Sequence, residues 1–250
     1  MIRLLLILLM FALPAGAETV VAGLSQNRVA ITANFDGSEI LVFGAVARDA
    51  PVPPGQLDVI VTIEGPAGPV IVRRKARRAG IWVNTDAVGI DTAPSFYAIA
   101  TTGPLSEILS ETDNLRHRIS IGRAVRTIGA SGQAADSPVF TDALIRLRRA
   151  SGVYLVEDGG VTLERDTLIR ADVRLPANLT EGIFRARIFL LREGRVVAVE
   201  ETAIDVQKAG IERFLHRLAL DRPLIYGILS LSLAILAGWL ASAAFTWLRR

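Results

Sequence analysis

PLIYGILSLSLAILAGWLASAAFTWL, residues 223–248, is an uncharged apolar run that lies between Arg222 and the terminal pair Arg249-Arg250. As an α-helix, Leu224 to Leu248 would be about 37 Å long, enough to cross a hydrocarbon core of about 30 Å with some tilt. The run predicts a transmembrane helix over 223–248 and a short cytoplasmic tail at 249–250. The rest of the chain is then a domain tethered to a lipid bilayer.

The N-terminal end predicts a removable signal peptide over residues 1–17. Arg3 precedes the apolar run Leu4 to Leu13, and Pro14 and the small-residue sequence Ala15-Gly16-Ala17 follow it, as in a secretory signal with its cleavage site. The run has about half the length that a membrane span needs. We therefore expect a mature start near Glu18, with an uncleaved anchor or a buried helix as the alternatives.

Signal and anchor together predict a single-pass protein of the bacterial inner membrane, with a periplasmic domain and a cytoplasmic C-terminus. The basic residues beside the anchor favour the opposite orientation, because cytoplasmic flanks are usually richer in Lys and Arg. We base the predicted orientation on the signal peptide, since the first translocated segment usually fixes the orientation. The outer flank has four such residues and the tail has two: Lys208, Arg213, Arg217 and Arg222 against Arg249 and Arg250.

The composition excludes several chemistries. The 250 residues include no cysteine, so the chain can have no disulfide, no thiol nucleophile and no lipid-bearing cysteine. Its two histidines, His117 and His216, are 99 positions apart, which argues against a histidine-based metal centre. We expect no metal and no cofactor. The net charge of +3 is small, and nucleic acid is not an expected partner outside the cytoplasm.

Residues 18–103 predict a β domain, because short runs rich in Val and Ile alternate with turn residues and show no helical period. In the run 57–64, apolar side chains face one way while Asp58, Thr62 and Glu64 face the other, as in a half-buried strand. The fold class is thus predicted to be mainly β, with an immunoglobulin-like β-sandwich. The expected strands are Val20–Leu24, Arg28–Asn34, Glu39–Ala47, Leu57–Glu64, Val70–Arg74, Gly80–Asn84 and Phe96–Thr101.

Residues 104–151 predict a helical and linker segment. The best helix is Pro138–Arg149, which Asp136 or Ser137 can cap. A shorter helix is expected over Pro104–Ser110, and the Gly- and Ala-rich stretch Gly129–Ala135 is typical of a linker. The apolar face of the main helix consists of Val139, Phe140, Ala143, Leu144 and Leu147.

Residues 152–206 predict a second, smaller β module. Thr167–Leu175 is its first clear strand, and Gly182–Leu191 should pair with Arg195–Val206 across a turn at Arg192-Glu193-Gly194. Residues 207–222 follow as an amphipathic juxtamembrane helix, with Ile211, Phe214 and Leu215 on its apolar side. A bend is expected at Pro223, because the residue before a proline avoids helical angles.

Small side chains recur at every fourth position of the anchor. Such a stripe lets a second helix approach closely, and hydroxyls on it can bond across the contact. It predicts an integral-membrane protein partner, or self-association through the helix; the alternative is that small residues are simply common in bacterial anchors. The stripe is Ser230, Ala234, Gly238 and Ser242, continuing to Thr246.

The densest group of charges is the basic cluster at residues 73–78, next to Trp82. An anionic ligand, an acidic partner or lipid headgroups could bind there, and a solvated loop is the alternative. Two further basic groups, Arg116 to Arg126 and Arg146 to Arg149, leave the same choice open. The cluster consists of Arg73, Arg74, Lys75, Arg77 and Arg78.

The sequence contains no recognisable catalytic motif. Gly129-Ala130-Ser131-Gly132 differs from a nucleophile elbow, because Gln133 stands where the second glycine should be. Phosphate-binding and dinucleotide-binding fingerprints are also missing from the sequence. A non-enzymatic protein is therefore expected, and a triad of His117 with a distant serine and aspartate is the alternative.

Several short motifs occur in a characteristic order. They are Phe140-Thr141-Asp142-Ala143-Leu144-Ile145-Arg146-Leu147, Gly152-Val153-Tyr154, Leu175-Pro176-Ala177-Asn178, Leu190-Leu191-Arg192-Glu193-Gly194, and Tyr226-Gly227 ahead of Ala237-Gly238-Trp239. With them the chain resembles, over nearly its full length, a family of transmembrane proteins known chiefly from alphaproteobacteria. Members are often encoded beside permeases similar to sulfite exporters, so the resemblance implies an accessory role in anion export. It brings no catalytic residues with it.

Three functional hypotheses result. The leading one is a non-enzymatic, single-pass envelope protein that acts as an accessory or interaction subunit of a membrane partner, such as an anion or sulfite-type permease. The second is a periplasmic binding module or sensor for a small oxyanion, with the cluster at residues 73–78 as its anion patch. The third is a periplasmic hydrolase, which would need a serine, a histidine and an acid brought together by the fold.

Overall fold

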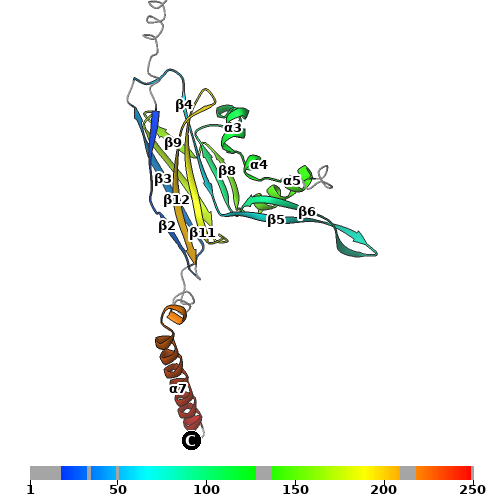
Figure 1. The fold of residues 1–250 in the computed structure, drawn as a ribbon, viewed down its shortest axis with the longest axis vertical. Helices are drawn as coiled ribbons and strands as arrows, with labels where there is room; N and C mark the ends of the chain where they lie inside the picture. Colours follow the sequence, from blue (N-terminus) through cyan, green and yellow to red (C-terminus); the bar gives the residue numbers. More distant parts are fainter. Residues whose placement is uncertain (1–17, 33–34, 49–50, 128–136, 209–217, 249–250) are drawn as a thin grey trace, which may run out of the picture. The chain divides into compact units, whose positions relative to one another are not determined.

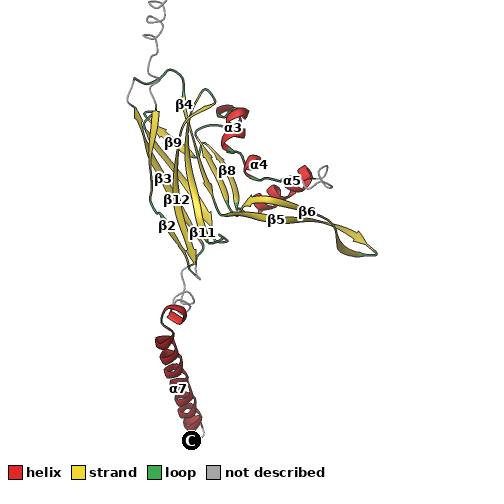
Figure 2. Ribbon diagram, viewed as in Figure 1, coloured by secondary structure: helices red, strands yellow, loops and turns green. Residues whose placement is uncertain are grey.

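The computed structural model describes residues 18–32, 35–48, 51–127, 137–208 and 218–248. The fold is mainly β, with short helices and one apolar C-terminal helix (Figures 1 and 2). The described residues divide into two compact units. The first contains the residues up to Val29 and those from Phe35 to Gln207, and the second contains residues 30–32 and the residues from Lys208 onward. The predicted signal peptide lies outside the described residues.

Two β-sheets make up most of the first unit. One has the strand order β1-β3-β10-β9, and the other has the order β2-β12-β11-β4-β7-β8. β7 and β8 pair in parallel, with Tyr97 opposite Tyr154. The strands are β1 (Glu18–Leu24), β2 (Arg28–Ile31), β3 (Gly37–Arg48), β4 (Leu57–Glu64), β7 (Tyr97–Thr101), β8 (Tyr154–Asp158), β9 (Val161–Glu164), β10 (Leu168–Pro176), β11 (Gly182–Arg192) and β12 (Arg195–Lys208).

The strands do not divide into an N-terminal sandwich and a second β module. β3 pairs with β10, where Val42 lies opposite Ala171, and β4 pairs with β11, where Ile63 lies opposite Ala186. Strands from 18–103 and from 152–206 are thus interleaved in both sheets, and the two predicted modules form one body. The alternation of apolar residues predicts which face of a strand is buried, but it does not select the partner strand.

The core lies where the apolar faces of the two sheets meet. Alternate residues of β3 and of β10 are buried, as expected for strands with one face inward, whereas β11 alternates up to Ile188 and is buried on both faces from there to Arg192. Packing of this kind stabilises a sandwich mainly through apolar area removed from water. Fully buried core residues include Ile40, Val42, Ile60, Ile63, Phe184, Phe189 and Leu190.

β4 differs from its prediction, because it is buried on both faces. Asp58 is 8% exposed and Thr62 is inaccessible, although alternation had placed both on a solvated face. β4 is flanked by β11 and β7 in the interior of its sheet. A short helical segment covers the outer face of that sheet, and His117 packs edge-on against Phe189 with 5.8 Å between ring centroids.

The helical segment contains α2 (Leu105–Ile108), α3 (Glu111–His117), α4 (Ile121–Ala124) and α5 (Ser137–Ala150). α2 and α5 confirm the two predicted helices, whereas α3 and α4 were not predicted. The Ser110 hydroxyl caps α3 by accepting from the Asp113 amide at 3.3 Å. Asp113 in turn accepts from the Val196 amide at 3.0 Å, which fixes α3 to the β11–β12 hairpin. The predicted linker Gly129–Ala135 lies outside the described residues.

A buried ion cluster joins the two sheets at one end of the sandwich. Glu18 begins β1, and its carboxylate accepts two hydrogen bonds at 2.8 Å from Arg192, which ends β11 in the opposite sheet. Arg48 of β3 donates a third at 2.8 Å. The three side chains are 4%, 9% and 13% exposed respectively. This cluster therefore connects the two sheets of the sandwich through a single carboxylate.

β5 (Ala67–Arg78) and β6 (Ile81–Pro94) form a separate two-stranded sheet. The turn between them is Ala79-Gly80, with φ of 49° and 85°, as a type I′ hairpin requires. Both strands are longer than the sequence predicts. In Figure 1 this hairpin extends away from the two sheets, beside α5 at its base.

The second unit contains α7 (Pro223–Leu248), the predicted anchor. Among the described residues it is the one helix long and apolar enough to cross a membrane, over Pro223–Ala241. Its 26 residues correspond to about 39 Å of helix. Helical residues 218–221 precede it and are interrupted at Arg222, where the sequence predicts a bend. Most of the predicted amphipathic helix, residues 209–217, lies outside the described residues.

Candidate functional site

The outer half of the β5–β6 hairpin has no core of its own. From Arg73 to Ala87 every residue is exposed or half-exposed, whereas Val72, Val88 and Ile90 at the base are buried. We call residues 73–87 the arm. A two-stranded ribbon with both faces in water is at best marginally stable by itself. An arm of this length is therefore suited to contact another molecule.

Large apolar side chains lie at the tip of the arm. Ile81 and Trp82 follow the turn and are 65% and 69% exposed. Trp82 lies opposite Arg77 in the strand register, and Ile81 lies opposite Arg78. Isolated exposed apolar residues are ordinary, but an exposed tryptophan beside arginines has the composition of an interface hot spot.

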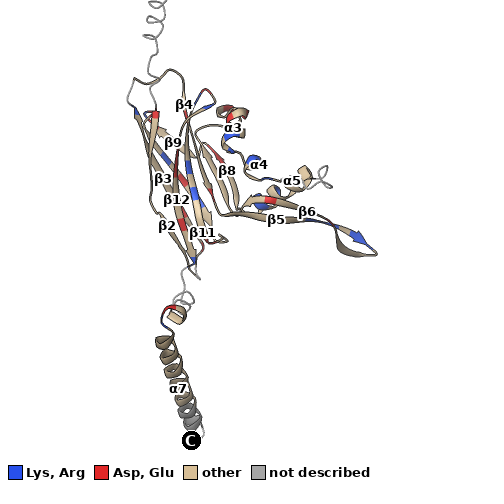
Figure 3. Cartoon of the chain, in the orientation of Figure 1, with Lys and Arg blue, Asp and Glu red and all other residues tan. Residues whose placement is uncertain are grey.

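The basic cluster predicted from sequence lies on β5 within the arm, and all five side chains are exposed. Figure 3 shows basic residues at the far end of the hairpin. Arg74 forms an ion pair with Asp86 at 3.0 Å, and Arg77 donates to the Gly80 carbonyl at 3.3 Å. Successive residues of a strand point to opposite faces, so these cations do not converge on one point. Their geometry favours an extended acidic surface over a single small anion.

An apolar groove of 290 Å³ lies between the base of the hairpin and α5. Val139 and Leu147 line it and are each 61% exposed, whereas Phe140 and Leu144 on the same helix are buried. The predicted apolar face of α5 is thus only partly covered. The Arg74 guanidinium lies 5.1 Å from the centre of the Phe140 ring, which holds the base of the arm against the helix.

The small-residue stripe lies along α7. Ser230, Ala234 and Gly238 are exposed, and a Cβ atom built on Gly238 would have no neighbour within 4 Å. The side chain of Ser242 is outside the described residues. Spacing of four residues keeps successive members of the stripe on the same side of the helix.

The sequence predicts the cations of the arm but not its apolar tip. Ile81 and Trp82 belong to an expected strand, and nothing in their sequence shows that both faces of that strand are exposed. The signal that could have indicated it is the absence of alternation from Arg73 to Arg78, because a half-buried strand would place apolar residues between these charges.

Comparison with known proteins identifies a membrane protein family. Residues 19–246 match the family described as "Putative transmembrane protein (Alph_Pro_TM)", and the chain belongs to this family. The match includes both the β-sandwich and most of α7. No curated protein matches the chain.

A solved structure with a limited likeness is the sporulation control protein Spo0M from Bacillus subtilis. It is 11% identical, with a TM-score of 0.27 over 81% of this chain. This chain spans 55% of the length of that protein.

Proposed function

We propose that this protein is a non-enzymatic, membrane-anchored accessory subunit whose arm binds an acidic surface of an integral-membrane partner, such as an anion permease. The arm carries the proposal, because it combines exposed Trp82 and Ile81 with a row of cations on a ribbon that lacks a core. Binding would remove apolar side chains from water and supply the packing that the ribbon lacks. The α7 stripe offers a second contact with the same partner inside the bilayer.

The proposal places the β-sandwich in the periplasm and the C-terminus in the cytoplasm, with α7 crossing the bacterial inner membrane once. The signal-like N-terminus supports this orientation. In this arrangement α7 tethers the sandwich at the membrane surface, and tethering raises the effective concentration of the arm near its partner. A modest affinity of the arm is then sufficient for stable association.

Photo-crosslinking in native membranes tests the partner. A photoreactive residue in place of Trp82 should give a discrete adduct with one membrane protein, and the same residue in place of Leu168 should not. Leu168 is a suitable control because it is 55% exposed on β10 of the sandwich, away from the arm. Adducts with lipid alone, or with a second copy of this chain, would contradict a membrane-protein partner.

Gly238→Leu tests the contact within the bilayer. The added side chain would keep a second helix from the close approach that the stripe permits, so co-purification of the crosslinked partner should fall at least tenfold while the protein stays inserted. Ala237→Leu is the matched control, because it adds similar bulk on a neighbouring face of the same helix. Equal recovery of the partner from both variants would show that the small-residue stripe of α7 does not contact the partner.

A further inference from the structure

A second concave site lies on the sandwich, apart from the arm. It is a cavity of 340 Å³ at the meeting point of β4, β11, the base of the hairpin and the α3–α4 segment. Cavities of about 300–1,000 Å³ are of the size that holds small ligands. The residues that line it are Glu64, Ala67, Thr92, Arg116, His117, Arg118, Ala124, Arg126, Arg185 and Arg187.

The lining has a large excess of positive charge. Five arginines and one carboxylate, that of Glu64, line the cavity, and one of the arginines, Arg116, also pairs at 3.2 Å with Asp113, which is not part of the lining. Glu64 is already shared, because it lies 3.2 Å from Arg185 and 3.9 Å from Arg187. Among the described residues Arg118 and Arg126 form no ion pair. Like charges that converge on one cavity repel each other, and an anion between them would relieve that repulsion.

Arg187 is held rigidly at the wall of this cavity. Its side chain is 15% exposed, and its Nη1 atom donates to the His117 carbonyl at 3.0 Å. Its guanidinium carbon lies 5.1 Å from the centre of the Phe189 ring. Its Nε atom is buried and has no hydrogen-bond partner in the described structure. A buried donor without a partner is costly, so this guanidinium group is held in place by its other contacts and not by a hydrogen bond from Nε.

His117 adds a neutral donor to the same wall. Burial lowers the pKa of its imidazole, and the nearby cations Arg116 and Arg187 lower it further against the opposing effect of Asp113. The ring is therefore mostly uncharged at neutral pH. Planar guanidinium groups and an imidazole together form a donor set that matches phosphate oxygens in geometry.

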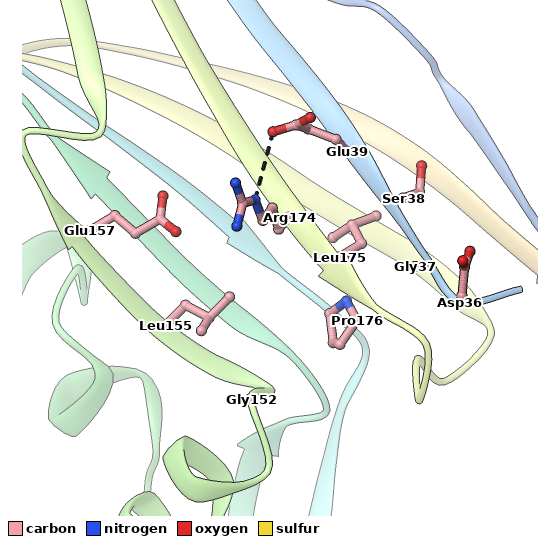
Figure 4. Close-up of a pocket in the computed structure, with 10 residues that line it drawn as sticks. All are labelled: Asp36, Gly37, Ser38, Glu39, Gly152, Leu155, Glu157, Arg174, Leu175 and Pro176. Carbon is pink, nitrogen blue, oxygen red and sulfur yellow. Dashed lines mark ion pairs between the residues drawn. The ribbon is translucent and has the colours of Figure 1, made fainter.

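The larger depression in Figure 4 provides a contrast. It has 630 Å³, and its single arginine, Arg174, lies 3.9 Å from Glu39. Asp36 and Glu157 also line it. Its cation is thus already neutralised, whereas the arginine-lined cavity keeps a surplus.

We infer that the arginine-lined cavity is a binding site for a small molecule that carries a doubly charged phosphate group. More than one negative charge is needed to balance the surplus, and bidentate arginine contacts favour tetrahedral oxyanions. The cavity is larger than the ion needs, so its ligand is a small organic phosphate monoester, whose phosphate group can carry two negative charges. This cavity is separate from the cations of the arm, so the inference does not depend on whether the arm has a partner.

Thermal unfolding of the full-length protein in zwitterionic nanodiscs tests the site. Sodium phosphate or sodium sulfate at 10 mM should raise the Tm by several degrees above sodium chloride of equal ionic strength, because a ligand that binds only the folded state stabilises it. The concentration is about a hundredfold above a Kd of roughly 0.1 mM, which corresponds to about 2.7 kcal/mol. A second set of measurements uses nanodiscs with phosphatidylglycerol and no added anion. Stabilisation seen only in the phosphatidylglycerol nanodiscs would show that the site binds a lipid headgroup, which would overturn the inference of a soluble ligand.

Two double variants separate the cavity from general charge effects. Arg116→Gln with Arg185→Gln should abolish the phosphate shift, and both side chains are exposed enough, at 68% and 53%, for the protein to fold. Arg73→Gln with Arg78→Gln on the arm removes the same charge and should leave the shift unchanged. No shift in the wild type, or equal shifts in both double variants, would overturn the site.

Discussion

Replacing Glu18 with Gln should lower the free energy of unfolding by about 3 kcal/mol, the largest stability effect expected from a single polar side chain in this protein. The substitution keeps the size of the side chain but removes the one negative charge between Arg48 and Arg192. Two guanidinium groups would then remain buried without a carboxylate, which costs more than the loss of an exposed pair. Chemical denaturation of the full-length protein measures the change.

The same cluster sets a pH dependence. Hydrogen bonds from Arg192 are the main cause that lowers the pKa of Glu18 to about 2 from its usual 4.5; burial opposes this and Arg48 adds to it. A lowered pKa means that the ionised carboxylate stabilises the folded state. That stabilisation, about 3 kcal/mol, is complete above pH 4.5 and is lost as the pH falls toward 2.

Glu39→Gln is the matched control for the Glu18 prediction. Glu39 also lies in the sandwich and pairs with Arg174, but at 3.9 Å and with both side chains largely exposed. Its loss should change the free energy of unfolding by less than about 0.5 kcal/mol. If Glu18→Gln has an equally small effect, or if its unfolding shows the same dependence between pH 2 and 4.5 as the wild type, the cluster does not hold the sheets together.

Reversing the charges at the tip of the arm should have the largest effect on association. Arg77→Glu with Arg78→Glu should weaken partner binding about a hundredfold, because two attractive contacts with an acidic surface become repulsive. Trp82→Ala alone should weaken it by about thirtyfold, as expected for a central aromatic contact. Titration of the reconstituted complex measures both affinities.

The arm variants should leave the sandwich intact. No residue from 73 to 87 is buried, so their free energies of unfolding should lie within about 0.5 kcal/mol of the wild type. Arg170→Glu with Arg174→Glu on β10, where Arg170 pairs with Asp172 at 3.3 Å and Arg174 with Glu39 at 3.9 Å, is the matched charge control and should bind as the wild type does. If the control weakens binding as much as the arm variants do, the partner recognises overall charge and not the arm.

The sequence predicts local elements of this protein well. β4 and the β11–β12 hairpin were expected almost residue for residue, because alternation and the Glu193-Gly194 turn depend on neighbouring residues. The anchor is equally local, since length and the absence of charge define it. The immunoglobulin-like arrangement stays a prediction.

Contacts between distant segments were not predictable in the same way. The pairing of β3 with β10 joins residues more than a hundred positions apart, and many strands with one apolar face could serve as partners. The arginine-lined cavity has the same origin, because Glu64, Arg116 and Arg187 meet only after the sheets and α3 are assembled. From sequence alone, the basic group at 116–126 was indistinguishable from a solvated face.

Trypsin cleavage on intact spheroplasts tests most directly whether the periplasmic arm is covered by a partner. The exposed turn residue Arg165 reports whether trypsin reaches the sandwich, and the exposed arm residues Arg77 and Arg78 report whether the arm is covered. We expect rapid cleavage at Arg165, protection of Arg77 and Arg78, and loss of that protection in Trp82→Ala or after solubilisation in detergent. Protection of all three sites would place the sandwich in the cytoplasm. Equal cleavage at all three would show that the arm has no partner.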